Sequence, residues 1–258
     1  MPSLREGEPV MMTPVRRVKY ALRNLIYPGL DLHVRNRASL CRFWRSGPRD
    51  FLDAGSGNGY FSWLAYRSGA RVVAFNMDPE QVDKAREFFI DFRGCDPARL
   101  RFEVRNLYEI SGEERRFDEI ICYETLEHIR RDEEVLRALA VLLRPGGVLH
   151  LCCPNKAHPR HMREVLDTQE SGGHVRPGYD IDDYRRLFAS VGLQMDKTAA
   201  IGPRSLYLAD ELLRQIRSRV GDLAALPLFP FMLPAVWLAR ADPPTPFSVY
   251  ARAVKPAA

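Results

Sequence analysis

The stretch FLDAGSGNGYF, residues 51–61, constrains the fold more than any other part of the chain. A short apolar run leads into Asp53, three glycines follow at every second position, and aromatic residues come next. Glycine loses more conformational entropy on folding than any other residue, so three in one turn indicate a backbone that bends sharply against a bound molecule. The stretch predicts a strand, a ligand-binding turn and a helix, in that order.

Short apolar runs alternate with amphipathic stretches from Arg49 to the end of the chain. We expect strands at residues 50–54, 71–75, 100–106, 117–123, 148–154, 193–201 and 246–254. We expect helices at residues 60–69, 79–92, 131–143 and 180–192, and a turn at 144–147. This alternation predicts an α/β fold, a doubly wound and mostly parallel sheet with helices on both faces. Ligands of such sheets bind at the carboxyl ends of the strands.

Three segments lie outside this alternation. Residues 1–48 are predicted to form one or two helices ahead of a domain spanning 49–258. Residues 157–179 form a long connection rich in Gly, His and Arg, and loops of this length are usually functional. Residues 202–245 form a helical insertion before the last strand, and its run 223–239 is strongly apolar. Three prolines in that run disfavour a membrane-spanning helix and favour a buried or interfacial flap.

Composition sets wide limits. With 258 residues and 46% hydrophobic content, the chain suits one domain with a small appendage. A net charge of +5 fits an anionic substrate, a membrane surface or nucleic acid and does not decide among them. The five cysteines show no paired spacing, and the first residues contain no secretion signal, so we expect a protein of the reducing cytoplasm.

The spacing of the glycines separates two ligand classes. Dinucleotide-binding enzymes use G-x-G-x-x-G, whereas this loop is G-x-G-x-G and places Tyr60 where the dinucleotide pattern needs glycine. A nicotinamide oxidoreductase is therefore disfavoured.

Five stretches in register resemble the class I S-adenosylmethionine-dependent methyltransferases, in particular the bacterial small-molecule type. These stretches are LDAGSGNG, VVAFNMDPEQVDKARE, FDEIICYETLEHI, LLRPGGVLHLCCPN and GHVRPGYDIDDYRRLFASVGL. The resemblance implies a Rossmann-like sheet of seven strands with an antiparallel last strand, S-adenosylmethionine as cofactor, and an N-terminal helical lid.

The resemblance also implies the residues that hold the cofactor. They are Asp53, Gly55, Ser56, Gly57, Asn58 and Gly59 in the glycine loop, Asn76, Met77 and Asp78 after the second strand, Asn106 and Leu107 after the third, and Tyr123 at the end of the fourth. Two positions depart from the family pattern. Asn76 stands where relatives carry the acidic residue that binds ribose, so either Asp78 replaces it or the amide makes a weaker bond. Asn106 likewise stands where many relatives carry Asp.

Methyl transfer is an in-line displacement, and a hydroxyl acceptor needs a base with a pKa near neutral. His128 follows Glu124 by four residues, so on a helical turn the two would pair and form an oriented base. His174 in the 157–179 connection is the second candidate base. The sequence contains no tight ligand motif, so we predict no metal.

Residues on the N-terminal segment and the long connection are expected to contact the substrate, namely His33, Arg37, Arg176 and Tyr179. The chain lacks the motifs of nucleic-acid methyltransferases and a basic stripe interleaved with aromatic residues, so we expect a small molecule and no nucleic acid. We expect a hydroxyl oxygen as acceptor; a nitrogen acceptor and a non-catalytic cofactor-binding module are the alternatives. Residues 202–245 could cover an apolar or lipid-linked acceptor, contact a membrane surface, complete the core or form a homodimer contact, and the sequence leaves these alternatives open.

Overall fold

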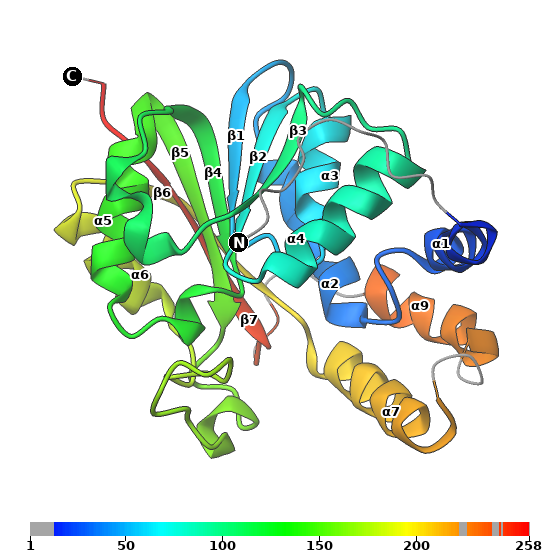
Figure 1. The fold of residues 1–258 in the computed structure, drawn as a ribbon. Helices are drawn as coiled ribbons and strands as arrows, with labels where there is room; N and C mark the ends of the chain where they lie inside the picture. Colours follow the sequence, from blue (N-terminus) through cyan, green and yellow to red (C-terminus); the bar gives the residue numbers. More distant parts are fainter. Residues whose placement is uncertain (1–12, 222–225, 239–242, 244, 258) are drawn as a thin grey trace.

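The computed structural model describes residues 13–221, 226–238, 243 and 245–257, and it contains one seven-stranded sheet flanked by helices (Figure 1). The strands are β1 (Asp50–Ala54), β2 (Arg71–Asn76), β3 (Leu100–Val104), β4 (Phe117–Tyr123), β5 (Leu143–Pro154), β6 (Gln194–Ile201) and β7 (Ser248–Val254). Their order in the sheet is β3-β2-β1-β4-β5-β7-β6, and β7 runs antiparallel to both of its neighbours. The predicted fold class is confirmed.

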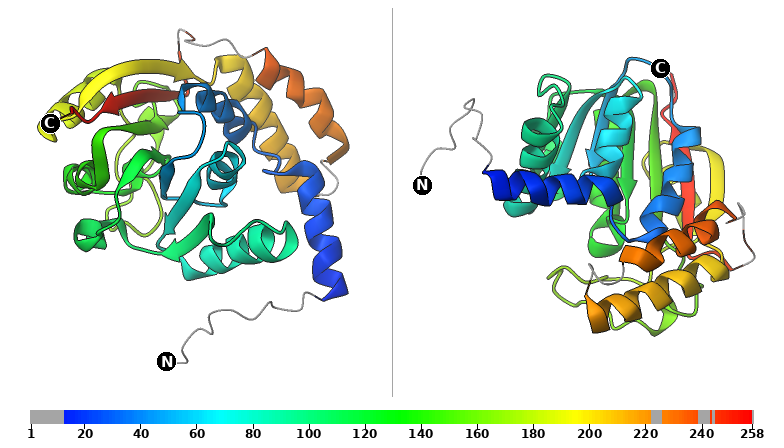
Figure 2. Two further views of the ribbon diagram at one scale, coloured as in Figure 1. Left: turned by 90° about the horizontal axis from the view of Figure 1, so that it is seen from above. Right: turned by 90° about the vertical axis from the view of Figure 1, so that its right-hand side faces the viewer.

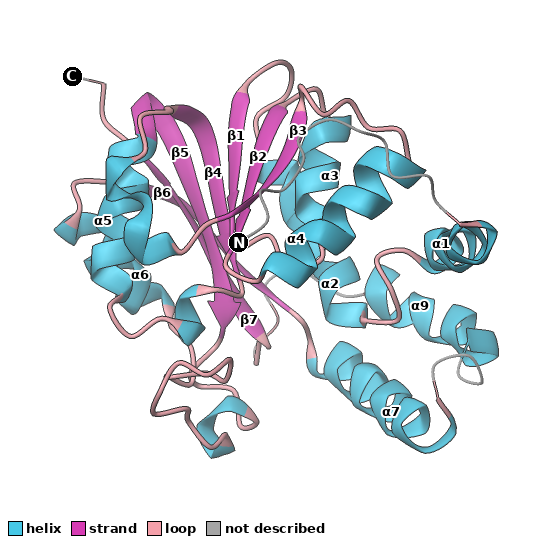
Figure 3. Cartoon of the chain, viewed as in Figure 1, coloured by secondary structure: helices cyan, strands magenta, loops and turns pink. Residues whose placement is uncertain are grey.

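Helices cover both faces of the sheet (Figures 1 and 3). They are α1 (Pro14–Ile26), α2 (Leu32–Arg37), α3 (Tyr60–Arg67), α4 (Pro79–Arg86), α5 (Asp132–Leu142), α6 (Ile181–Ser190), α7 (Arg204–Val220) and α9 (Phe229–Trp237). Shorter helical turns are η1 (Ala38–Phe43), η2 (Glu87–Phe92), η3 (Leu107–Gly112), η4 (Leu126–His128), η5 (His161–Arg163) and η6 (Leu226–Leu228). Helices α5 and α6 lie on one face of the sheet, and α3 and α4 lie on the other.

The local sequence explains where these helices begin. Pro79 opens α4, and Asp78 before it caps the helix by accepting hydrogen bonds from the backbone nitrogens of Glu80 and Gln81. Asp180 and Asp183 form a reciprocal capping box at the start of α6. The predicted helix over 79–92 is continuous, but its second half, η2, winds as a π-helix.

The sheet separates two apolar clusters. One contains Leu136, Leu139 and Tyr184 from α5 and α6, and the other contains Phe88 and Phe89 of η2 beneath α1. Strands β1 and β4 are buried along most of their length, and each contains an uninterrupted apolar segment, residues 51–52 in β1 and 120–123 in β4.

A third, smaller cluster joins the N-terminal segment to the insertion before β7. Leu30 and Leu32 pack against Leu206 and Leu213 of α7 and against Phe229 of α9. Figure 2 shows α1, α7 and α9 together on one side of the molecule. The run 223–239 is thus only partly an apolar flap: Phe229 is buried, Phe231 is exposed, and residues 222–225 and 239 lie outside the described residues.

Candidate functional site

The glycine loop lies between the carboxyl end of β1 and the start of α3. Gly55, Gly57 and Gly59 all have positive φ angles, of 93°, 49° and 79°, which glycine adopts at little cost. The backbone nitrogens of Gly55 and Ser56 donate to the carbonyl oxygen of Phe75, at 3.0 and 2.9 Å, and fix the loop against β2. The predicted tight turn after the first strand is therefore present.

The three glycines differ in what surrounds them. A Cβ at Gly55 would lie 2.2 Å from Oγ1 of Thr125, and one at Gly59 would lie 2.7 Å from the ring of Phe89. A Cβ at Gly57 would meet no protein atom within 4 Å. Two glycines are therefore required by packing, whereas Gly57 presents bare backbone to open space, as close approach to a ligand requires.

Asp53 lies beneath this loop near the end of β1. Its side chain is buried, and its Oδ2 accepts a hydrogen bond of 2.6 Å from the hydroxyl of Ser62 in α3. Burial raises the pKa of Asp53 to about 7, and the hydrogen bond from Ser62 opposes part of that shift. Asp53 therefore changes its charge near neutral pH.

The residues after β2 are connected to one another and to the glycine loop. Asn76 Nδ2 lies 3.4 Å from the carbonyl oxygen of Gly57, and Asn76 Oδ1 accepts from the backbone nitrogen of Asp78 at 2.9 Å. Asp78 itself is engaged as the cap of α4, while the side chain of Met77 is 70% exposed. Both side chains are thus engaged within the protein, Asp78 with the start of its helix and Asn76 with Gly57 and Asp78, and either could still border the ribose.

Asn106 and Tyr123 have partners of their own. Asn106 Oδ1 accepts from the backbone nitrogen of Tyr108 at 3.1 Å and starts the turn η3, in which Leu107 is buried. The hydroxyl of Tyr123 accepts from Nε1 of Trp44 at 3.2 Å. This bond ties the end of β4 to the N-terminal segment.

Glu124, directly after β4, has a strained backbone with a φ of 49°. Its carboxylate lies 3.1 Å from the guanidinium of Arg37, a buried residue of α2, and 3.4 Å from the hydroxyl of Ser248. Burial raises the pKa of Glu124, and Arg37 opposes that shift. Strained non-glycine residues concentrate at functional sites, so Glu124 and its partner Arg37 remain candidate site residues.

The predicted pair of His128 with Glu124 is not what the structure contains. His128 Nδ1 lies 2.9 Å from the carbonyl oxygen of Gly173 instead, and Glu124 pairs with Arg37. The reason is local geometry: Glu124 and Thr125 are not helical, and residues 126–128 form a 3₁₀ turn, so the four-residue spacing of an α-helix does not apply.

His128 and His174 face each other, with ring centroids 4.8 Å apart. His174 Nδ1 lies 2.9 Å from a carboxylate oxygen of Glu164. Because carbonyl and carboxylate oxygens accept hydrogen bonds, both Nδ1 atoms carry the proton, and in the neutral rings both Nε2 atoms have a free lone pair. The structure thus contains a histidine held by a carboxylate, but the pair is His174 with Glu164 and not His128 with Glu124. No spacing pattern in the sequence indicated this pair.

Glu127 completes this cluster. It is fully buried, and neither carboxylate oxygen has a hydrogen-bond partner among the described nitrogen and oxygen atoms. Burial is the main cause that raises the pKa of Glu127 well above its ordinary range, and the negative charge of Glu124 adds to it. Donor atoms of Glu127, His128 and His174 lie within 4.8 Å of one another, so these three could hold a proton or a divalent cation. The absence of a metal remains a prediction.

Arg176 and Tyr179, expected to face the substrate, are occupied elsewhere. Arg176 contacts Asp132 at the start of α5 and donates to the carbonyl oxygens of Ile129 and Arg130 at 2.7 and 2.9 Å. The hydroxyl of Tyr179 donates to Asp132 Oδ2 at 2.7 Å, and its side chain is buried. Both residues anchor the 157–179 connection to the domain, and their contact with the substrate remains a prediction.

His33 stacks on Phe247 with ring centroids 4.0 Å apart, and burial lowers its pKa to about 3, so the ring is neutral. It lines a cavity of about 200 Å³ together with Asp31, Arg160, Asp210, Arg214, Arg217 and Phe247. Phe247 immediately precedes β7. Because β7 is antiparallel to β5, the amino end of β7 lies beside the carboxyl end of β5. His33 therefore lies near the carboxyl end of β5, and its contact with the substrate remains a prediction.

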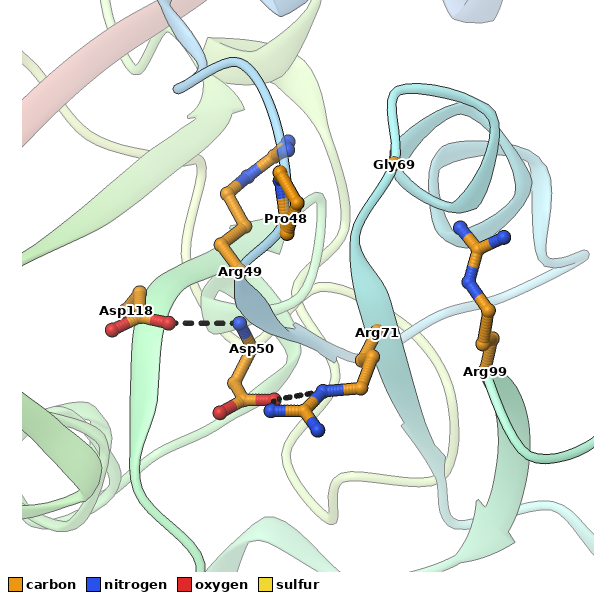
Figure 4. A pocket seen from close by; sticks show the side chains of 7 residues that line it. All are labelled: Pro48, Arg49, Asp50, Gly69, Arg71, Arg99 and Asp118. Atoms are coloured by element: carbon orange, nitrogen blue, oxygen red, sulfur yellow. Dashed lines mark hydrogen bonds and ion pairs between the residues drawn. The ribbon is translucent and has the colours of Figure 1, made fainter.

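A wider hollow of about 730 Å³ lies at the other end of the parallel strands, where these strands begin (Figure 4). It is lined by Pro48, Arg49, Asp50, Gly69, Arg71, Arg99 and Asp118. Asp50 opens β1, and its carboxylate is paired with Arg71 at 2.8 Å. Ligands of open α/β sheets bind at the carboxyl ends of the strands, so this hollow at the amino end is not the candidate site.

Comparison with known proteins decides the family. A family model described as a methyltransferase domain matches residues 30–198. The chain belongs to this methyltransferase family. The predicted family and enzyme class are thereby confirmed, and S-adenosylmethionine is supported as the cofactor.

A ubiquinone biosynthesis O-methyltransferase of Xanthomonas axonopodis pv. citri (strain 306) is 33% identical to the chain over 134 residues. The alignment covers 50% of this chain and 54% of that protein, so the chain spans about half the length of the curated relatives it matches.

Solved structures show the same fold at low identity. A methyltransferase structure from Bacillus halodurans C-125 superposes with a TM-score of 0.59 at 14% identity, covering 85% of this chain and 98% of that one. The phosphoethanolamine N-methyltransferase 2 of Haemonchus contortus, solved in complex with S-adenosyl-L-methionine, superposes with a TM-score of 0.56 at 17% identity, covering 86% and 52%.

Among the described helices, none is both long and apolar enough to cross a bilayer.

Proposed function

We propose that this methyltransferase transfers the methyl group of S-adenosylmethionine to a hydroxyl oxygen of a small molecule. Two observations support an oxygen acceptor. The curated relatives are named O-methyltransferases, and the Nδ1 atoms of His128 and His174 face oxygen acceptors, which leaves Nε2 of each neutral ring able to accept a proton. A hydroxyl must lose its proton as it attacks the methyl carbon, and a neutral imidazole is suited to accept it.

In this proposal the cofactor lies over the carboxyl ends of β1, β2 and β4. The loop from Gly55 to Gly59 would carry the methionine part above Asp53, with the open face of Gly57 in direct contact. Asn76 and Met77 would border the ribose, and Asn106 with Leu107 would border the adenine. Because Asn76 and Asn106 are amides, their hydrogen bonds lack the charge-assisted strength of carboxylates.

We assign the proton-accepting role to His174, oriented by Glu164, together with His128. A base that is held by a second group keeps its lone pair directed at the acceptor, which is the arrangement that activates nucleophiles in many enzymes. The ion pair of Arg37 with Glu124 would close the site from the side of α2. Arg37 and His33 thus remain the proposed substrate contacts of the N-terminal segment.

Asp53 should make cofactor binding depend on pH. The pKa of Asp53 is about 7 when no cofactor is bound. The positive charge of the cofactor favours the ionised carboxylate, so the pKa should be lower in the complex. The affinity for S-adenosylmethionine should therefore fall below pH 7, approaching about tenfold per pH unit, and be constant above it. Calorimetry between pH 5.5 and 8.5 measures this. Asp53→Asn should remove the dependence, and a parent protein whose affinity does not change with pH would contradict the assignment.

His174→Ala and His128→Ala should each lower kcat about 100-fold, since a positioned base contributes at least this much. Glu164→Gln should have a smaller effect, because His174 is kept and only its orientation is weakened. Cofactor affinity should not change in any of the three variants. Steady-state rates together with calorimetry test this, and turnover within twofold of the parent in both histidine variants would assign the base elsewhere.

A panel of acceptors tests the proposed function itself. Hydroxylated aromatic compounds and matched amines are incubated with the protein and S-adenosylmethionine, and S-adenosylhomocysteine and methylated products are measured by mass spectrometry. Methyl ethers from the hydroxyl compounds are expected. Methylated amines alone would favour the nitrogen alternative, whereas cofactor binding without turnover on any acceptor or cell-extract fraction would favour a non-catalytic module.

A further inference from the structure

Helix α1 presents two unlike faces. Its inner face packs on the domain through Tyr20, whose hydroxyl donates to Glu87 at 2.8 Å, and through Arg16, which contacts the same carboxylate at 2.8 Å. The guanidinium of Arg23 lies 4.4 Å from the ring centroid of Phe88. These contacts fix which side of α1 points outward.

The outer face is apolar. Val15, Val18, Leu22 and Leu25 are 79%, 61%, 56% and 81% exposed, and their spacing of three and four residues places them in one stripe along the helix. Helices on a water-exposed surface usually turn such a stripe inward, and contiguous exposed apolar patches mark sites of contact with other molecules or membranes. Figure 2 shows α1 at the periphery of the molecule.

The charge of the helix points to the partner. The sequence of α1, PVRRVKYALRNLI, contains four basic residues and no acidic one. Arg17 and Lys19 are exposed beside the apolar stripe. An apolar stripe flanked by lysine and arginine is the pattern of helices that lie in the interface of a bilayer with anionic lipids.

We propose that α1 docks the protein on the surface of an anionic lipid bilayer, with Val15, Val18, Leu22 and Leu25 entering the boundary between headgroups and acyl chains. A second copy of the chain is a poorer occupant, because pairing two α1 helices through the apolar stripe would bring the exposed Arg17 and Lys19 of both copies together. This docking goes beyond methyl transfer and is independent of it.

The docked helix lies next to the cofactor site. The hydroxyl of Tyr27, directly after α1, donates to the carbonyl oxygen of Asn58 in the glycine loop at 3.3 Å. On the same side of the molecule, Phe231 of α9 is 79% exposed. Docking through α1 would therefore bring the edge of the site close to the bilayer, where an acceptor with an apolar tail is concentrated.

Co-sedimentation of the full chain with vesicles tests the proposal without any turnover. Binding to phosphatidylcholine vesicles that contain phosphatidylglycerol is expected, with much weaker binding to phosphatidylcholine alone. The double variant V18Q/L22Q should bind the anionic vesicles at least tenfold more weakly, and R17E/K19E should lose the preference for anionic lipid. Glutamine and glutamate are good helix formers, and all four side chains are exposed, so the fold should be kept.

Val141→Gln is the matched control, since Val141 is 50% exposed on α5, away from α1. It should bind vesicles as the parent does. Binding that is absent, or equal in the parent and V18Q/L22Q, would overturn the proposal. A parent dimer that V18Q/L22Q dissociates, without vesicle binding, would assign the face to a second copy instead. Since the assay does not involve methyl transfer, failure here leaves the proposed function untouched.

Discussion

Gly57→Val is expected to weaken binding of S-adenosylhomocysteine about 5- to 100-fold while the protein stays folded. The Cβ of residue 57 meets no protein atom, so the added methyl groups enter only the space that the cofactor would occupy. Overpacking a filled site costs about 1–3 kcal/mol, and each 1.4 kcal/mol is a factor of ten in affinity. Calorimetry with S-adenosylhomocysteine measures the effect.

Gly94→Val is the control for backbone strain. Gly94 also has a positive φ, 66°, and open space at its Cβ, but it follows η2 and is not part of the glycine loop. Both variants should lose stability through the left-handed backbone, about 1–2 kcal/mol, whereas only Gly57→Val should lose affinity. Equal affinities of Gly57→Val and the parent would remove the glycine loop from the cofactor site.

Glu119→Ala is expected to lower the free energy of unfolding by about 3–5 kcal/mol. Glu119 is fully buried in β4, pairs with Arg49, and lies 2.9 Å from Nε2 of His150, whose Nδ1 contacts the hydroxyl of Tyr250 at 2.8 Å. Removing the carboxylate leaves the guanidinium of Arg49 buried without its counter-charge. Losing one partner of a buried pair costs far more than an exposed pair contributes.

Urea unfolding of the parent and the variant measures this difference. Glu134→Ala serves as the control, because Glu134 is 48% exposed on α5 and its ion pair among the described residues is with the exposed Arg131. That change should lie within about 0.5 kcal/mol of the parent. A Glu119→Ala protein as stable as Glu134→Ala would mean that the buried network does not stabilise the sheet.

The sheet could be predicted because its signal is local. Strands β1 and β4 begin and end at the predicted residues, since each is a short apolar run bounded by polar and turn residues. Strand β3 ends at Val104 rather than at residue 106, because Asn106 hydrogen bonds to the backbone nitrogen of Tyr108 and begins a turn. The hydrophobic pattern of the sequence gives no information about this hydrogen bond.

The candidate catalytic residues could be predicted only in part. His128 and His174 lie side by side, but their hydrogen-bond partners, and the pairing of Glu124 with Arg37, depend on the 3₁₀ turn after β4 and on the path of the 157–179 connection. Glu127 was not predicted as a site residue, since nothing in the neighbouring sequence shows whether its carboxylate is buried or exposed. The contacts of Arg176 and Tyr179 with Asp132 were not predicted either, because they depend on how the long connection is anchored to the domain.

The most direct test of the account follows the methyl group. The protein is incubated with S-adenosylmethionine carrying a trideuterated methyl group and with hydroxylated aromatic acceptors, and the products are analysed by mass spectrometry. The account predicts a trideuteromethyl ether together with an equal amount of S-adenosylhomocysteine, and much less of both with His174→Ala. A label found on nitrogen, or S-adenosylhomocysteine that binds without any labelled product, would contradict it.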